Sequence, residues 1–179
     1  MTALALWKQK LGIEKAPDLS GNAAVQDGVK MEPILRDYYI ATRPQYTLEY
    51  FPFDILSQTE KPFITATLDG ELLDPAGRKG VLEIKNVSIS NKTALEKWTG
   101  GKMPEYYYVQ LIAQLSATGF QFARLFAALH FMNGDTTLKE FEVERDEVID
   151  DIEWLTERMT VFWEQNIIGG TMPPQPLIL

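Results

Sequence analysis

Apolar residues recur along the chain with two different periods, which predicts a protein built from both helices and strands. Spacings of three to four residues are typical of helices with one buried face, and they occur over residues 4–10, 23–41, 104–118 and from Asp146 onward. Short apolar runs bounded by Gly, Pro, Asn or Asp are typical of strands, and they occur over residues 46–53, 62–68, 80–86, 122–132 and 138–144.

The order of these segments narrows the fold class. Three consecutive strands favour an antiparallel meander, and the Asn133-Gly134-Asp135 turn favours a hairpin between the last two strands. We therefore predict an α/β (α+β) protein with a mainly antiparallel central sheet flanked by helices. At 179 residues the chain has the length of one domain, so residues 1–179 are predicted to form a single domain.

The composition excludes several kinds of active site. There is no cysteine, which excludes disulfides, thiolate zinc sites, cysteine nucleophiles and iron–sulfur clusters. His130 is the one histidine, and its apolar neighbours favour a packed or strand-end residue over a member of a Ser-His-Asp triad. No apolar run approaches the roughly 20 residues of a membrane span, and the N-terminus lacks a secretory apolar region, so we expect a cytoplasmic protein without a membrane partner.

The formal net charge of −8 is concentrated towards the C-terminus. Residues 135–179 hold eleven acidic and three basic residues, whereas residues 1–134 hold fourteen of each. For nucleic-acid binding the distribution of charge matters more than its sum. The acidity of the chain therefore does not exclude DNA as a partner.

The candidate chemistry lies at Glu83-Ile84-Lys85 and at Asp69, fourteen positions before Glu83. Alternate side chains of a strand share a face, so Glu83 and Lys85 lie side by side in an otherwise apolar run. If the preceding strand pairs with this one, Asp69 reaches the same end of the sheet. Two carboxylates can hold Mg²⁺, and a lysine beside them can assist phosphodiester cleavage. A surface ion pair is the alternative interpretation of a Glu-x-Lys sequence alone.

Two helices offer further polar side chains. Glu32 lies between Gly28 and Pro33, both of which weaken a helix, and a solvated glutamate is its alternative interpretation. Gln110 and Gln114 lie one turn apart in a mostly apolar helix, so both could reach one pocket. The alternative interpretation is that these two glutamines form an exposed polar stripe on the helix.

The segment over residues 91–101 is rich in lysine. Lys92, Lys97 and Lys102 surround Trp98, and Gly100-Gly101 interrupts the segment. One interpretation is a mobile flap that contacts DNA, and the other is a surface helix whose tryptophan packs inward.

Five short motifs follow one another in a characteristic order. They are Gly28-Val29-Lys30-Met31-Glu32, Asp69-Gly70, Gly80-Val81-Leu82-Glu83-Ile84-Lys85, Pro104-x-x-Tyr107-x-x-Gln110 with the following Gln114, and Val143-Glu144-Arg145-Asp146-Glu147. Their order and spacing resemble the PD-(D/E)xK nuclease superfamily, and within it the lambda-exonuclease or YqaJ-type viral recombinase family. Leu68 stands where the family's Pro-Asp-Gly sequence has its proline. The resemblance covers about residues 4–165.

The resemblance implies a restriction-endonuclease-like core with a mixed sheet and a divalent metal site. Mg²⁺ or Mn²⁺ would be bound by two carboxylates and one main-chain carbonyl, those of Asp69, Glu83 and Ile84. Glu32 would support a second metal or its waters. Lys85 would orient or deprotonate the attacking water, and Gln110 would hold the lysine or a phosphate. The residues expected to contact DNA are Lys30, Arg78, Lys92, Lys97, Trp98, Lys102, Tyr107 and Gln114.

The function that the resemblance implies is that of a Mg²⁺-dependent deoxyribonuclease. Its most specific form is a phage or prophage 5′→3′ double-strand exonuclease that resects DNA ends for a single-strand annealing partner in recombination. The alternatives are a structure-specific or nicking endonuclease on the same core, and a non-catalytic DNA-binding or assembly subunit. The joint presence of Asp69, Glu83, Lys85 and Gln110 argues against the non-catalytic alternative.

Two further expectations concern assembly and the N-terminus. Ring-shaped trimers occur in the family, so the resemblance leaves a homo-oligomer open. About twenty-five residues precede the helix that carries Glu32, and they contain no match to the family's basic pocket for a 5′-phosphate. The N-terminal region is therefore expected to be that of a short form or of a fragment.

Overall fold

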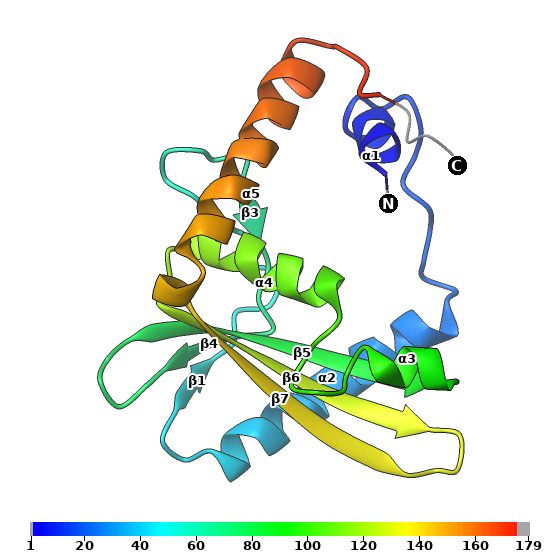
Figure 1. The fold of residues 1–179 in the computed structure, drawn as a ribbon, viewed down its shortest axis with the longest axis vertical. Coiled ribbons are helices and arrows are strands. Elements are labelled where there is room, and N and C mark those ends of the chain that lie inside the picture. The colour runs from blue at the N-terminus through cyan, green and yellow to red at the C-terminus, as the bar shows by residue number, and fades with distance from the viewer. Residues whose placement is uncertain (1, 175–179) are drawn as a thin grey trace.

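The computed structural model describes residues 2–174 and is organised around one five-stranded sheet (Figure 1). The order is β1-β4-β5-β6-β7, with strands at Thr47–Glu49, Gly70–Leu73, Lys79–Ile89, Phe122–Phe131 and Thr136–Glu144. β5 and β6 run parallel, and the other three pairs are antiparallel. The predicted mixed, mainly antiparallel sheet is therefore confirmed. A separate ribbon pairs β2 (Leu56–Ser57) with β3 (Thr65–Ala66).

Helices cover both faces of the sheet (Figure 1). They are α1 (Ala3–Lys10), α2 (Ala23–Thr42), α3 (Lys92–Glu96), α4 (Glu105–Thr118) and α5 (Ile149–Val161), which a π-helical segment over Phe162–Ile168 continues. α2 packs on one face of the sheet, and α4 and α5 pack on the other. The predicted helices are confirmed, although the last begins at Ile149, after a 3₁₀ turn over Arg145–Glu147.

The alternation of side chains along the central strands divides the core into two parts. Odd-numbered residues of β5 and β6, such as Val81 and Leu125, pack under α4 and α5. Even-numbered residues, such as Leu82 and Phe126, pack against Tyr39 of α2. Both central strands are mostly apolar on both faces, as expected for strands covered by helices on each side. By the same alternation, the side chains of Glu83 and Lys85 face α4.

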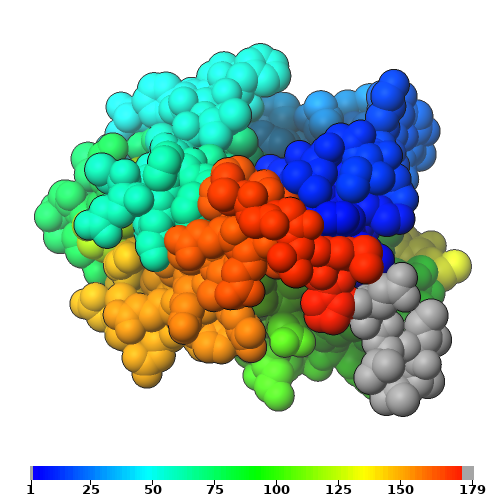
Figure 2. Space-filling model, turned by 90° about the horizontal axis from the view of Figure 1, so that it is seen from above, coloured from blue at the N-terminus to red at the C-terminus, as the bar shows by residue number. Residues whose placement is uncertain are grey.

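The first helix lies against the end of the described chain. Figure 2 shows α1 beside the segment that follows α5, although the two are far apart in the sequence. The Trp7 indole Nε1–H donates a hydrogen bond to the carbonyl of Asn166 at 2.9 Å. This contact ties the N-terminal helix to the π-helical segment.

Two strand predictions are wrong in extent. Within residues 62–68 only Thr65–Ala66 is a strand, and the neighbour of β5 begins at Gly70. The break occurs at Asp69, whose side chain, rather than a main-chain carbonyl, accepts the N–H of Ile84. The strand predicted over residues 46–53 ends at Glu49, because Pro52 cannot donate to a ladder and Phe53 has a φ of 66°.

Other sequence interpretations are resolved by burial and hydrogen bonding. Trp98 is 2% exposed and packs against Tyr107, so the inward-packed tryptophan is confirmed and a contact between Trp98 and DNA is not supported. Both ring nitrogens of His130 are hydrogen-bonded, to Asn86 and to Thr136, as expected for a strand-end histidine. Among residues 2–174, no helix is long and apolar enough to cross a membrane.

Gly80 is the glycine at which an added Cβ would come closest to a neighbouring atom, so its substitution tests the packing. A Cβ at this position would lie 2.2 Å from the ring of Phe122 on the neighbouring strand. We expect Gly80→Ala to lower the free energy of unfolding by about 1–3 kcal/mol, measured by urea denaturation. Gly28→Ala is the control, because a Cβ there meets nothing within 4 Å, and alanine should stabilise α2 by about 1 kcal/mol. Equal stability of Gly80→Ala and the wild type would contradict this packing.

Candidate active site

The candidate site lies where β5 extends past Gly70, the first residue of β4. The last residue pair between these strands is Gly70 with Leu82, so on this side β5 has no paired strand residue from Glu83 onward within the described chain. The other side of β5 stays paired with β6 as far as Ile89. α2 and α4 approach the open edge from opposite faces of the sheet (Figure 1). Side chains from both helices and from β5 therefore meet there.

Asp69 is held at this edge by main-chain contacts. Its Oδ2 accepts the N–H of Ile84 at 2.7 Å, and its own carbonyl accepts a hydrogen bond from Arg36 Nε at 2.6 Å. The carboxylate thus takes the position where a strand residue would pair with β5. The sequence expectation that Asp69 and Glu83 reach the same end of the sheet is confirmed, because residue 69 directly precedes the Gly70–Leu82 pair.

Glu83 is a buried carboxylate with partners on both oxygens. It is 3% exposed. Its Oε1 accepts hydrogen bonds from Lys85 Nζ and from Gln110 Nε2, the latter at 2.7 Å. Its Oε2 accepts one from Gln114 Nε2 at 2.5 Å. Burying a charge is costly unless it is paired and hydrogen-bonded, and these contacts meet that condition. Glu83 and Lys85 are therefore not the surface ion pair of the alternative interpretation.

Glu32 enters the site from α2 through an arginine. Arg36, one helical turn further on, forms an ion pair with Glu32 and also donates to the carbonyl of Asp69. The guanidinium lies under the ring of Tyr50, 3.4 Å from its centre, and Arg36 is 8% exposed. Arg36 thus connects the Glu32 carboxylate to the Asp69 segment. Sequence reasoning missed this residue, although an arginine four positions after a glutamate in a helix is a recognisable ion-pair signal.

The carboxylates are close enough to affect each other's protonation. Burial, together with the negative charges of Glu83 and Glu32, raises the pKa of Asp69 to about 7. The hydrogen bond from Ile84 and the charge of Lys85 act in the opposite direction but are outweighed. Without a further cation, the site therefore disfavours a second ionised carboxylate beside Glu83.

The donor set fits a divalent metal ion, but the side chains are arranged around internal partners. Glu32, Asp69 and Glu83 supply hard oxygen ligands, which Mg²⁺ and Mn²⁺ prefer. Across residues 2–174, no three acidic or histidine side chains converge into a metal-binding cluster. The cause is local, since Glu32 pairs with Arg36 and Glu83 with Lys85. Burial is the main cause of the raised pKa of Asp69, and the charges of Glu83 and Glu32 add to it, so an added cation would favour the ionised carboxylate.

Five of the eight residues predicted to contact DNA lie at the site or on the exposed surface. Tyr107 lies at the site, its ring centre 5.1 Å from Lys85 Nζ. Lys97 and Lys102 line a surface groove of about 310 Å³ beside the exposed Tyr106. Lys30 and Lys92 are exposed on α2 and α3.

Arg78 is exposed, so its contact with DNA stays a prediction, whereas Gln114 does not match its predicted role. Arg78 lies at the turn before β5 and is paired with Asp74 and Glu144, away from the open edge. Gln114 is 3% exposed and donates to Glu83, so the prediction that it contacts DNA is wrong. The prediction for Gln114 failed because the helical period shows which face of the helix a residue is on, but not how deeply its side chain is buried.

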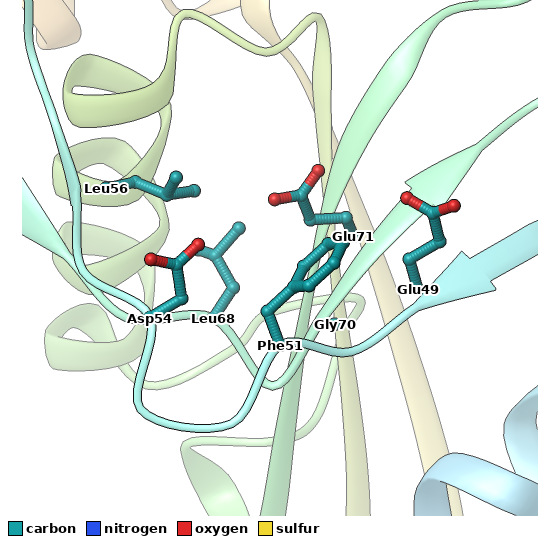
Figure 3. A pocket seen from close by; sticks show the side chains of 7 residues that line it. All are labelled: Glu49, Phe51, Asp54, Leu56, Leu68, Gly70 and Glu71. Carbon is teal, nitrogen blue, oxygen red and sulfur yellow. The ribbon is translucent and has the colours of Figure 1, made fainter.

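A second hollow lies beside β4, and its lining includes Leu68 and Gly70, the two neighbours of Asp69 in the chain. Figure 3 shows Glu49, Asp54 and Glu71 around it, and Phe51 on the loop that follows β1 also lines it. Glu71 forms an ion pair with Lys79. Neither Asp69 nor Glu83 lines this hollow.

A mixed α/β core that carries Asp69, Glu83 and Lys85 at the open edge of its sheet has the architecture of the PD-(D/E)xK superfamily. Residues 1–121 match the YqaJ-like viral recombinase domain, and the chain belongs to this family. The uncharacterized protein YqaJ of Bacillus subtilis (strain 168) is 26% identical over 172 residues, which cover 96% of this chain and 50% of that protein. The chain thus spans half the length of this relative.

Solved structures agree with the fold. The alkaline exonuclease LHK-Exo of Laribacter hongkongensis is 21% identical, with a TM-score of 0.56, covering 93% of this chain and 83% of that one. A phage-related exonuclease of Haemophilus somnus 129PT is 15% identical, with a TM-score of 0.59, covering 94% and 82%. At these identities the likeness shows a shared fold.

The raised pKa of Asp69 predicts how stability depends on pH in metal-free solution. This carboxyl group binds its proton more tightly in the folded than in the unfolded chain, so its contribution to stability is full below about pH 4 and is lost as the pH rises through about 7. Asp69→Asn should remove this loss and be more stable than the wild type at pH 8 in EDTA. Urea denaturation at pH 5 and pH 8 measures the effect, and parallel pH profiles for the two proteins would contradict it.

Proposed function

We propose that this protein is a divalent-metal-dependent DNA nuclease, and specifically a phage-type 5′→3′ exonuclease that acts on duplex ends in recombination. The observation that carries the proposal is the meeting of Asp69, Glu83 and Lys85 at the open edge of β5. Two carboxylates and one ammonium group thus lie beside the unpaired edge of β5. Such a set suits the hydrolysis of a phosphodiester bond.

The metal site would use Asp69, directly before β4, together with residues of β5. Asp69, Glu83 and the carbonyl of Ile84 would hold Mg²⁺ or Mn²⁺, and Glu32 would support a second ion. When bound, the cation supplies positive charge that polarises a phosphate oxygen and lowers the pKa of a neighbouring water. The same charge would offset the repulsion from Glu83 and Glu32, which adds to the effect of burial on the pKa of Asp69.

Lys85 and Gln110 would serve the reacting groups. The Lys85 ammonium donates to Glu83 Oε1 and keeps further N–H groups with which it can hold a water or a phosphate oxygen. Gln110 donates to the same carboxylate oxygen, so it fixes the position from which the lysine acts. Tyr107 covers the lysine on the side of α4. Each of these side chains is oriented by another, as a preorganised site requires.

The family and the fold support the more specific part of the proposal. The matching domain is described as that of a viral recombinase, and both solved neighbours are exonucleases by name. An enzyme that resects DNA ends would need a single-strand annealing protein as its partner in recombination. A homo-oligomer that encloses the duplex would keep it on the DNA between cuts. Polarity, assembly and partner are proposals for the whole protein.

A cleavage assay tests the proposal directly. The wild type, Lys85→Ala and Lys15→Ala are incubated with end-labelled linear duplex, nicked circular DNA and covalently closed circular DNA, with Mg²⁺ or EDTA. We expect loss of linear duplex only, abolished by EDTA and reduced by about 10²–10⁴-fold in Lys85→Ala. Lys15 is an exposed loop residue, so Lys15→Ala should keep full activity.

The other outcomes separate the competing functions. Cleavage of the closed circle would replace the exonuclease with an endonuclease on the same core. Binding of DNA without cleavage in either Mg²⁺ or Mn²⁺ would contradict the enzymatic proposal and favour a binding subunit. Labelling the 5′ end and the 3′ end separately gives the polarity.

A further inference from the structure

Gln114 makes two hydrogen bonds that join separate parts of the site. Its Nε2 donates to Glu83 Oε2 at 2.5 Å and to the carbonyl of Thr67 at 3.1 Å. The residue is 3% exposed, in the fourth position after Gln110 on α4. One amide group therefore connects β5 with the segment that leads into Asp69, which lies two residues after Thr67.

The neighbouring strand pairs and hydrogen bonds do not make the link between Glu83 and Thr67 that Gln114 makes. Strand pairing between β4 and β5 begins only at Gly70, so it does not hold Thr67. The Asp69 carboxylate is fixed through Ile84, and Glu83 is fixed on Oε1 through Lys85 and Gln110. Gln114 alone, among the described residues, donates to both Glu83 and Thr67.

The amide can adopt only one orientation. Both of its partners are acceptors, a carboxylate oxygen and a carbonyl oxygen, so the NH₂ group must face them. Its Oε1 is then buried without a hydrogen-bond partner. An unpaired buried acceptor is unfavourable, and a methionine of similar length would fill the same space without one. Core packing alone does not account for a glutamine here, whereas the two donated bonds do.

We infer that Gln114 is a positioning residue that sets the spacing between the Asp69 and Glu83 carboxylates before a cation binds. This inference rests on the proposed metal-dependent function. Gln110 differs in its role, because it shares Glu83 Oε1 with Lys85 and is only half-buried, towards the reacting groups. Gln114 donates to Glu83 Oε2, the carboxylate oxygen that Lys85 does not contact. Its loss should affect the metal ligands and leave contacts with DNA intact.

The test compares Gln114→Met with Gln58→Met as the matched control. Gln58 is a partly buried glutamine whose Nε2, like that of Gln114, donates to a main-chain carbonyl, here that of Ser116, and whose Oε1 likewise has no partner. Mn²⁺ affinity is measured by isothermal titration calorimetry on the full chain, together with Tm and with kcat and KM on linear duplex. We expect Gln114→Met to weaken Mn²⁺ binding and to lower kcat by about 10–100-fold, with the KM for DNA unchanged. Gln58→Met should change only Tm.

Several results would overturn the inference. One is a Gln114→Met protein that binds Mn²⁺ as tightly as the wild type and differs from it only in Tm, as Gln58→Met does. Absence of Mn²⁺ binding by the wild type would overturn it as well. If Gln114→Met does not fold, Gln114→Asn replaces it, because the shorter amide cannot span both acceptors and should show the same loss of Mn²⁺ affinity. Wild-type Mn²⁺ binding that depends on Gln114, without cleavage of any DNA, would refute the nuclease proposal and support the positioning role.

Discussion

The hydrogen bond from the Ile84 N–H to the Asp69 carboxylate is the interaction on which the site depends. It takes the place of a main-chain contact just before β4 begins, beside the part of β5 that β4 does not pair with. A carboxylate is thereby fixed at a sheet edge that helices can approach from both faces. Arg36 reaches this edge from α2, and Gln110 and Gln114 reach Glu83 from α4. A longer β4 would have closed the edge with backbone and left no room for side-chain chemistry.

Charge explains why this edge is suited to a cation. Glu32 and Glu83 each have a basic partner, Arg36 and Lys85 respectively. Asp69 has main-chain contacts and a raised pKa, chiefly because it is buried and also because the carboxylates of Glu83 and Glu32 lie near it. Buried carboxylates are stable when paired with cations, and a bound divalent ion would complete that pairing. A bound cation would therefore act on the same group, Asp69, whose raised pKa makes folding depend on pH.

Much of the fold and part of the site could be predicted from the sequence, because periodicity reports burial. Residues 122–132 and 138–144 were recognisable as a hairpin, and alternation alone places Glu83 beside Lys85. The start of β4 was not predictable, because the apolar run over residues 62–68 looks the same whether it pairs in the sheet or packs elsewhere. The bond of Arg36 to the carbonyl of Asp69 joins residues 33 positions apart. No local pattern reports such a contact, nor the depth at which Gln114 is buried.

Calorimetric titration of Mn²⁺ at pH 7 in two buffers of different ionisation enthalpy tests the central claim most directly. It compares the wild type with Asp69→Asn and Glu83→Gln. If Asp69 and Glu83 form a metal site, the wild type should bind Mn²⁺ and release protons on binding, because Asp69 is partly protonated at this pH. Glu83→Gln should lose most of the affinity, and Asp69→Asn should lose both affinity and proton release. Binding that is equally tight in all three proteins, or that releases no protons from the wild type, would contradict the account.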